Sequence, residues 1–234
     1  MPELAVLVYH DIDPQATSDV SCTPTQFAEQ MRAILHSGYQ PVSLEETRLF
    51  LLGAIPGARR PVLITFDDGY ESVYTYALPL AVQLRIPMTV FVVTSRIGLK
   101  PQFLPYLTRE MISRMATSGL FDFGSHTHDL HVNSLMIAEA FHTRPNPFLT
   151  HVRQDLVQSR DTLESITKRK VTALAWPYGK YDWEMTETAR QCGFFLHFTS
   201  RFGYNPPGSN PLGIKRIPVT IRDTPETILK KLRN

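Results

Sequence analysis

The stretch Leu63-Ile64-Thr65-Phe66-Asp67-Asp68-Gly69 decides the fold class and locates a candidate site. Its first four residues are apolar or β-branched, a composition that predicts a buried strand. The strand ends in two adjacent carboxylates and a glycine, which permits a sharp turn. Two neighbouring carboxylates at such a position do not both ionise readily unless a cation lies between them. Alternatively, one of the two caps a helix that begins near Tyr70.

A second polar cluster, further along the chain, favours the cation. The stretch Gly124-Ser125-His126-Thr127-His128-Asp129-Leu130-His131 follows a short apolar segment at 120–123 and holds three of the eight histidines. A carboxylate and a pair of histidines at strand ends are typical ligands of a divalent metal with an open coordination position. From the residues alone, His126, His128 and His131 all remain candidate ligands.

The composition limits the classes of function. The chain has 234 residues, of which 43% are hydrophobic, so we expect a single domain over residues 1–234. The net charge is +2 without a long basic run, which argues against a nucleic-acid partner. We find no long apolar span, export signal or lipidation motif. Cys22 and Cys192 could pair, but two cysteines do not identify the redox compartment.

Predicted strands and helices alternate along the chain, with capping boxes at Thr23 and Ser43 marking two helix starts. This alternation predicts an α/β fold with a parallel sheet. Polar residues follow four of the strands at their C-terminal ends, which favours a barrel with its site on that rim. A doubly wound open sheet is the alternative, although a Gly-rich phosphate loop is missing. We expect strands at 4–10, 63–66, 87–94, 120–123, 171–175, 194–199 and 214–219, and helices between them, including one at 150–168.

Thr65-Phe66-Asp67-Asp68-Gly69, together with Ser125-His126-Thr127 and His131, resembles the motifs of the polysaccharide deacetylases of carbohydrate esterase family 4, the NodB-type domain. The resemblance covers nearly the whole chain and implies a distorted (β/α)7 TIM-like barrel. In that family the first Asp of the motif is the general base, and the second binds a metal with two histidines. The resemblance therefore implies Asp67 as base and Asp68 as ligand of one divalent ion, with zinc preferred over nickel, cobalt or iron.

Two departures from the common family pattern point to one branch. The order Ser-His-Thr-His-Asp-Leu-His is similar to the branch that deacetylates poly-β-1,6-N-acetylglucosamine in biofilm matrices. There the first and last histidines are the ligands, which implies His126 and His131. The general-acid element, usually near the C-terminus, is resembled here by residues 8–11, so the motif order is circularly permuted and His10 becomes the acid. His197 competes for that role, but its aromatic neighbours favour a packed side chain.

Residues 175–179, Ala-Trp-Pro-Tyr-Gly, resemble the Pro-Tyr turn of the family. Many members have an arginine shortly before this proline that orients the base, and none stands there here. What orients Asp67 is therefore open. By resemblance, the backbone N–H of Tyr178 faces the oxyanion, and Trp176 either stacks on a sugar ring or fills the core.

The implied activity is metal-dependent removal of N-acetyl groups from a β-linked N-acetylglucosamine polymer, with poly-β-1,6-N-acetyl-D-glucosamine as the first candidate and acetate as product. Peptidoglycan and chitin-type oligosaccharides are alternative substrates. A hydrolase of another amide or ester, or a non-catalytic glycan-binding module, are alternative functions. The resemblance also implies an extracellular, cell-surface or periplasmic location, and we expect a monomer. Apolar residues at 135–138 and 148–149 could contact a membrane surface or polymer, or cover the core.

Overall fold

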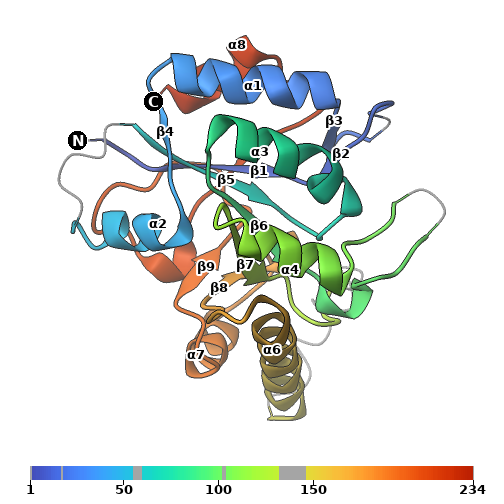
Figure 1. The fold of residues 1–234 in the computed structure, drawn as a ribbon. Coiled ribbons are helices and arrows are strands. Elements are labelled where there is room, and N and C mark those ends of the chain that lie inside the picture. Colours follow the sequence, from blue (N-terminus) through green and yellow to red (C-terminus); the bar gives the residue numbers. More distant parts are fainter. Residues whose placement is uncertain (1, 17, 55–59, 102–103, 132–145, 234) are drawn as a thin grey trace.

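A curled sheet of parallel strands forms the centre of the computed structural model, which describes residues 2–16, 18–54, 60–101, 104–131 and 146–233 (Figure 1). The strand order is β10-β1-β5-β6-β7-β8-β9, and β4 adds to β5. Two short strands, β2 and β3, pair separately. The strands are β1 (Ala5–Tyr9), β2 (Asp11–Ile12), β3 (Ser21–Cys22), β4 (Gln40–Pro41), β5 (Pro61–Phe66), β6 (Met88–Val92), β7 (Phe121–Ser125), β8 (Ala173–Ala175), β9 (Leu196–Phe198) and β10 (Ile217–Pro218).

The segment that leads into β10 joins the two ends of the sheet. Ile214 forms a parallel bridge with Phe198 of β9, and Ile217 pairs with Leu7 of β1. The N–H of Ile214 donates to the carbonyl of His197 over 2.8 Å, which fixes this closure. The sheet therefore curls into a small barrel, so the predicted α/β, TIM-like barrel is confirmed and the doubly wound alternative is wrong.

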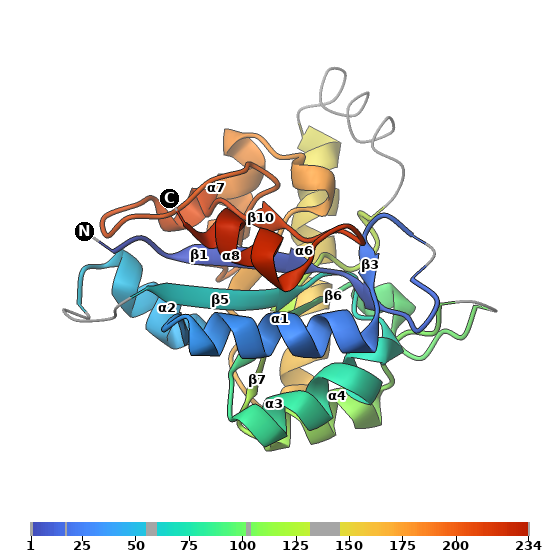
Figure 2. The same cartoon turned by 90° about the horizontal axis from the view of Figure 1, so that it is seen from above.

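Helices cover the outside of the sheet, and α1 and α8 lie side by side across β1 and β5 (Figure 2). Both predicted capping boxes are present, at Thr23 and Ser43. The helices are α1 (Pro24–His36), α2 (Leu44–Leu51), α3 (Leu78–Leu84), α4 (Arg109–Thr117), α6 (Asn146–Thr167), α7 (Trp183–Gln191) and α8 (Pro225–Leu232). Short helical turns are η1 (Val73–Ala77), η2 (Thr94–Arg96), η3 (Pro177–Gly179) and η4 (Pro211–Gly213).

Two helices differ from the sequence-based expectation, and proline explains both differences. The helix expected between the strands at 63–66 and 87–94 contains Pro79 and includes the π-helical turn η1 before α3, because proline has no N–H to donate to the carbonyl four residues earlier. Helix α6 begins at Asn146 instead of residue 150, since proline is tolerated in a first helical turn. Phe148 and Leu149 are partly buried against the core. The apolar residues 135–138 lie outside the described residues.

Alternate residues of the strands face two different cores, as the period of a strand requires. One core fills the barrel interior and includes Val6, Leu63 and Phe91. The other lies between the sheet and the outer helices and includes Leu7 and Ile64. Asp67 follows Leu63 by four residues, so the backbone at Asp67 continues the interior row to the mouth of the barrel.

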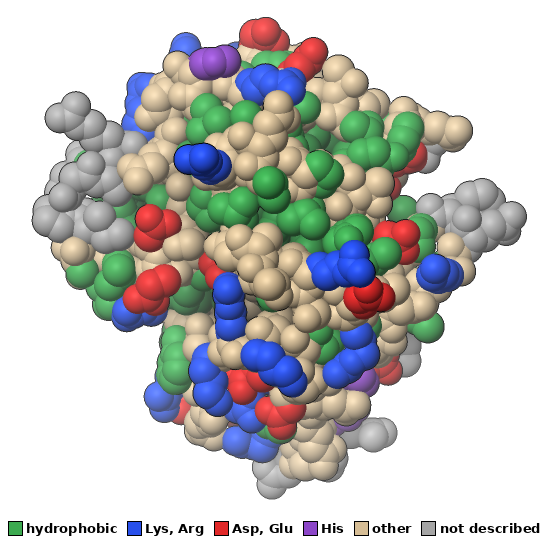
Figure 3. All heavy atoms as spheres, viewed as in Figure 1, with side chains coloured by type: hydrophobic (Ala, Val, Ile, Leu, Met, Phe, Trp, Pro, Cys, Tyr) green, Lys and Arg blue, Asp and Glu red, His purple; other side chains and the backbone are tan. Residues whose placement is uncertain are grey.

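The structure also bears on three sequence-based expectations, which concern the cysteines, membrane spans and surface charge. Cys22 and Cys192 are both buried and free, so the pairing that we left open does not occur. Among the described residues, every helix is too short or too polar to cross a bilayer. On the face shown in Figure 3, Lys and Arg side chains are interleaved with Asp and Glu, in keeping with a net charge of only +2.

Candidate metal centre and catalytic residues

The turn after β5 delivers both aspartates to the mouth of the barrel. Asp68 and Gly69 have φ angles of +71° and +81°, so the chain reverses sharply at these two residues. A Cβ atom on Gly69 would lie 3.1 Å from Cγ1 of Val92, which leaves little room for any other residue. As a result, Asp67 and Asp68 are both buried but their side chains meet different partners.

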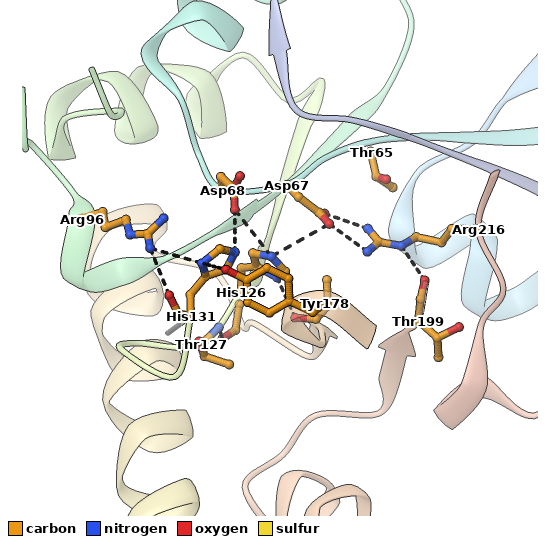
Figure 4. Close-up of polar contacts among 12 residues, drawn as sticks. Thr65, Asp67, Asp68, Arg96, His126, Thr127, His131, Tyr178, Thr199 and Arg216 are labelled. Carbon is orange, nitrogen blue, oxygen red and sulfur yellow. Dashed lines mark hydrogen bonds and ion pairs between the residues drawn. The ribbon is translucent and has the colours of Figure 1, made fainter. Parts of the chain in front are cut away.

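The carboxylate of Asp68 faces two imidazole rings (Figure 4). Its Oδ1 atom lies 3.0 Å from Nε2 of His131 and 3.6 Å from Nε2 of His126. The same Oδ1 is buried and has no hydrogen-bond partner among the described residues. One ligand atom from each of these three residues falls within 4.8 Å of the other two. Two imidazole nitrogens and a carboxylate oxygen that lacks a hydrogen-bond partner form a ligand set that fits a divalent metal ion with an open coordination position.

His126 is held in the orientation that a ligand needs. Its Nδ1 lies 2.7 Å from the carbonyl of Ala175, so Nδ1–H donates there and the lone pair of Nε2 faces the aspartates. Burial lowers the pKa of His126, more than Asp67 and Asp68 raise it, which favours the neutral imidazole. A neutral ring is the form that binds a metal ion.

His131 is covered from the solvent side by Tyr178. Their ring centroids are 4.9 Å apart, and the Tyr178 side chain remains about half exposed. Tyr178 has a φ angle of +55°, an uncommon conformation for a residue other than glycine. Arg96 donates from Nη2 to the backbone carbonyl of His131 over 3.1 Å. These contacts fix the far end of the histidine cluster.

His128 is not one of the three clustered ligands. Its Nδ1 lies 2.9 Å from the hydroxyl of Thr94, away from the Asp68 carboxylate. The structure thus brings His126 and His131 together with Asp68 and leaves His128 apart, whereas the residue spacing alone had left the three histidines equivalent.

Arg216 orients Asp67, and the sequence analysis missed it. Its Nη1 and Nη2 donate to Oδ1 and Oδ2 of Asp67 over 2.7 and 2.8 Å, and its Nε donates to the carbonyl of Thr199 over 2.9 Å (Figure 4). Burial on its own would raise the pKa of Asp67, but Arg216 and then His126 hold it below its usual value. The available signal was a pair of basic residues, Lys215 and Arg216, inside a predicted strand, 214–219, that is otherwise apolar.

His10 lies at the end of β1, close enough to both carboxylates for its charge to favour their ionised forms. Its Nδ1 is buried without a hydrogen-bond partner among the described residues. The competitor His197 is fully buried, its Nε2 lies 3.2 Å from the carbonyl of Phe194, and burial lowers its pKa to about 4. His197 therefore has the packed environment that its aromatic neighbours indicated, and His10 remains the predicted acid.

Trp176 cannot stack on a sugar ring, so that part of the sequence-based expectation is wrong. The side chain is fully buried. One face stacks on Tyr181 with ring centroids 5.9 Å apart, and His197 makes an edge contact. A tryptophan at a strand end can face either solvent or core, and here it fills the core.

A family model described as "Polysaccharide deacetylase" matches residues 54–196, more than half of the chain. The chain belongs to the polysaccharide deacetylase family. The matched residues include both aspartates and the histidine cluster, whereas His10 and Arg216 lie outside them. In this polysaccharide deacetylase, the candidate site thus also includes residues on either side of the matched segment.

Similar proteins within the family include enzymes named for one polysaccharide. The chain is 30% identical over 175 residues to the poly-beta-1,6-N-acetyl-D-glucosamine N-deacetylase of Staphylococcus epidermidis, covering 74% of this chain but 59% of that protein. It is 26% identical to the Staphylococcus aureus protein of the same name, covering 96% and 76%. The structure of IcaB from Ammonifex degensii is 30% identical, with a TM-score of 0.87 over 99% of this chain and 98% of that one.

Proposed function

We propose that this protein is a metal-dependent hydrolase that removes N-acetyl groups from poly-β-1,6-N-acetyl-D-glucosamine and releases acetate. The observation that carries the proposal is that the carboxylates of the two adjacent aspartates contact different partners. Asp67 is bound by Arg216, and Asp68 faces the Nε2 atoms of His126 and His131. The names of the Staphylococcus relatives support this polymer over other acetylated sugars.

The metal would be held by Asp68, His126 and His131, and we take zinc as the first candidate, with nickel, cobalt or iron as alternatives. A divalent ion supplies Lewis acidity, which makes water more acidic and polarises a carbonyl group. The ligand set is largely preorganised, because Ala175 fixes the His126 ring and Arg96 holds the backbone at His131.

Asp67 is the proposed general base. Because Arg216 keeps its carboxylate ionised, Asp67 can take a proton from the water that attacks the acetyl carbon. A backbone N–H at Tyr178 would stabilise the oxyanion that forms, a contribution of about 3 kcal/mol per donor in comparable sites. The C–O bond forms in this step, before the C–N bond breaks.

His10 is the proposed general acid. The glucosamine nitrogen leaves readily only when it is protonated, and a histidine can supply that proton near neutral pH. His10 lies beside the two carboxylates. Asp67 therefore takes a proton from the attacking water, and His10 gives a proton to the leaving nitrogen. Acetate and a polymer with a free amine are the products.

A substrate panel with and without metal tests the proposal. The purified protein should release acetate from β-1,6-linked N-acetylglucosamine oligomers faster than from chitin-type oligomers or peptidoglycan fragments. Activity should be lost on chelation and return when one equivalent of zinc is added. Elemental analysis of the purified protein identifies the ion that it carries.

Three outcomes of this panel would contradict the proposal in different ways. Faster release from chitin-type or peptidoglycan substrates would assign a different polymer. Hydrolysis of other amides or esters alone would remove the sugar assignment. Binding of the oligomers without acetate release, at any metal content, would indicate a glycan-binding module.

The location of the protein follows from the proposed substrate, and both the location and the assembly state are part of the proposal. A polymer of the cell surface or biofilm matrix requires the enzyme in the same compartment: extracellular, surface-bound or periplasmic. We expect a monomer, because each residue assigned above comes from one chain. Light scattering of the purified protein measures the assembly state.

A further inference from the structure

The residues between His126 and His131 belong to neither a strand nor a helix, yet they set the distance between two ligands. Thr127 has a φ angle of +71°, which is strained for a β-branched residue, and its side chain is fully buried. A strained turn keeps its conformation only when its surroundings impose it. The contacts around this turn therefore decide how well the two histidines are placed.

Asp155 of α6 binds the centre of the turn. Its Oδ1 accepts the N–H of His128 over 2.7 Å, and its Oδ2 accepts the N–H of Asp129 over 2.6 Å. The Asp155 side chain is nearly fully buried, with 4% exposure. Hydrogen bonds to an ionised acceptor are short and strong, and both oxygens are used here. The two N–H groups are adjacent in sequence and lie between the two ligands.

Ser159 binds the start of the same turn, one helical turn further along α6. Its Oγ lies 2.6 Å from Oγ of Ser125, which in turn accepts the N–H of Thr127 over 2.9 Å. Ser159 and Asp155 are four residues apart and so share one face of the helix. This face of α6 therefore holds the chain from Ser125 to Asp129.

The opposite side of the turn is held by η2. The N–H groups of Thr94 and Ser95 donate to the carbonyls of Thr127 and His128, each over 3.1 Å. The peptide groups of the turn are thus bound through their carbonyls on one side and through their N–H groups on the other. Loss of the Asp155 contacts would leave the carbonyls anchored and release the N–H groups, which allows the peptide planes to rotate.

We propose that Asp155 is a positioning residue that sets the spacing of His126 and His131, and with it the affinity for the metal, without touching the metal. The inference rests on the proposed metal site. It adds a residue that lies outside the family motifs identified in the sequence. Outer contacts of this kind are commonly worth 10- to 100-fold in metal affinity.

The test is the metal dissociation constant of Asp155→Asn, measured by competition with a chromophoric chelator. Asparagine is close in shape but has one oxygen, so one of the two N–H groups would face an NH2 group. We expect affinity to fall about 10- to 100-fold. The matched control is Asp161→Asn, which removes the same charge from an exposed position on the same helix and should leave the affinity unchanged.

Two further measurements separate positioning from general destabilisation. The absorption spectrum of the cobalt-loaded Asp155→Asn protein should differ from that of the wild type, and excess metal should restore most of its kcat. Ser159→Ala gives a milder version of the same defect and decides the question if Asp155→Asn does not fold.

Equal metal affinities in the wild type and in Asp155→Asn would overturn the inference, as would equal affinities in the wild type and in Ser159→Ala if Asp155→Asn does not fold. So would a wild-type protein that binds no divalent metal. Because the titration uses no sugar, its result is independent of whether the proposed substrate is correct.

Discussion

Arg216 and Asp67 are joined by two parallel hydrogen bonds at the mouth of the barrel, with Nη1–Oδ1 and Nη2–Oδ2 distances of 2.7 and 2.8 Å. Both side chains are about 3% exposed, so the pair lies in a region with little solvent screening. A two-pronged contact fixes the plane of the carboxylate as well as its charge. Arg216, which lies near the C-terminal end of the sequence, thereby orients the carboxylate of the candidate base Asp67 and keeps it ionised.

Replacing Arg216 should impair the base without affecting the metal. Arg216→Lys keeps a positive charge but cannot form the two-pronged contact, so kcat should fall about 100-fold. Arg216→Met also removes the charge that holds the pKa of Asp67 down, so the acid limb of the kcat/KM profile should move to higher pH. Arg201→Met, at an exposed position, is the control. An unchanged acid limb in Arg216→Met would show that another group controls it.

The two adjacent aspartates should respond differently to the same substitution. Asp67→Asn should keep wild-type metal affinity and lose 10²- to 10⁴-fold in kcat, because the base is removed and the ligands are not. Asp68→Asn should lose both metal and activity. Metal content and acetate release measured on the same samples check this. Loss of metal from Asp67→Asn would mean that the roles are shared or reversed.

The role of His10 can be tested with a substrate whose leaving group needs no proton. His10→Ala should lose 10²- to 10⁴-fold in acetate release from the N-acetylated oligomer. It should lose far less on an aryl acetate, since a phenolate leaves without general acid. His36→Ala, which changes an exposed histidine at the end of α1, serves as the control. Equal losses on both substrates would point to a structural defect instead.

Buried His197 should make the stability depend on pH in mildly acidic solution. Its pKa is lowered by burial from an ordinary value of 6.5 to about 4 in the folded protein. Between these values the unfolded chain takes up a proton that the folded protein does not, so the free energy of unfolding falls as the pH falls from 6.5 to 4. The upper limit of this loss is about 3 kcal/mol.

Denaturant unfolding at several pH values measures this effect. His197→Gln should have a flatter dependence than the wild type across that window, whereas the exposed His36→Gln should keep the wild-type dependence. If all three proteins lose stability in parallel, a different group is responsible.

The fold and the family could be predicted because their signals are local. An apolar, partly β-branched run that ends in Asp67-Asp68-Gly69 predicts a strand, a turn after it, and the placement of the two aspartates at the rim of the barrel. Arg216 and Asp155 could not be found in this way, since each acts on a segment distant in sequence and neither lies in a distinctive motif. The position of Trp176 was undecided for another reason: the alternation of a strand does not say which face of a barrel its end residue meets.

The joining of β9 to β1 through residues 214–218 has a consequence for synthesis on the ribosome. β10, which contains Ile217, is the last strand of the barrel to emerge from the ribosome. It must nevertheless fit, with the segment that leads into it, between β9 and β1, which were made earlier. Until then the nascent chain has two open sheet edges, and Asp67 lacks its guanidinium partner. A polypeptide released early, with every proposed metal ligand already present, would therefore still lack the contact that orients the proposed base.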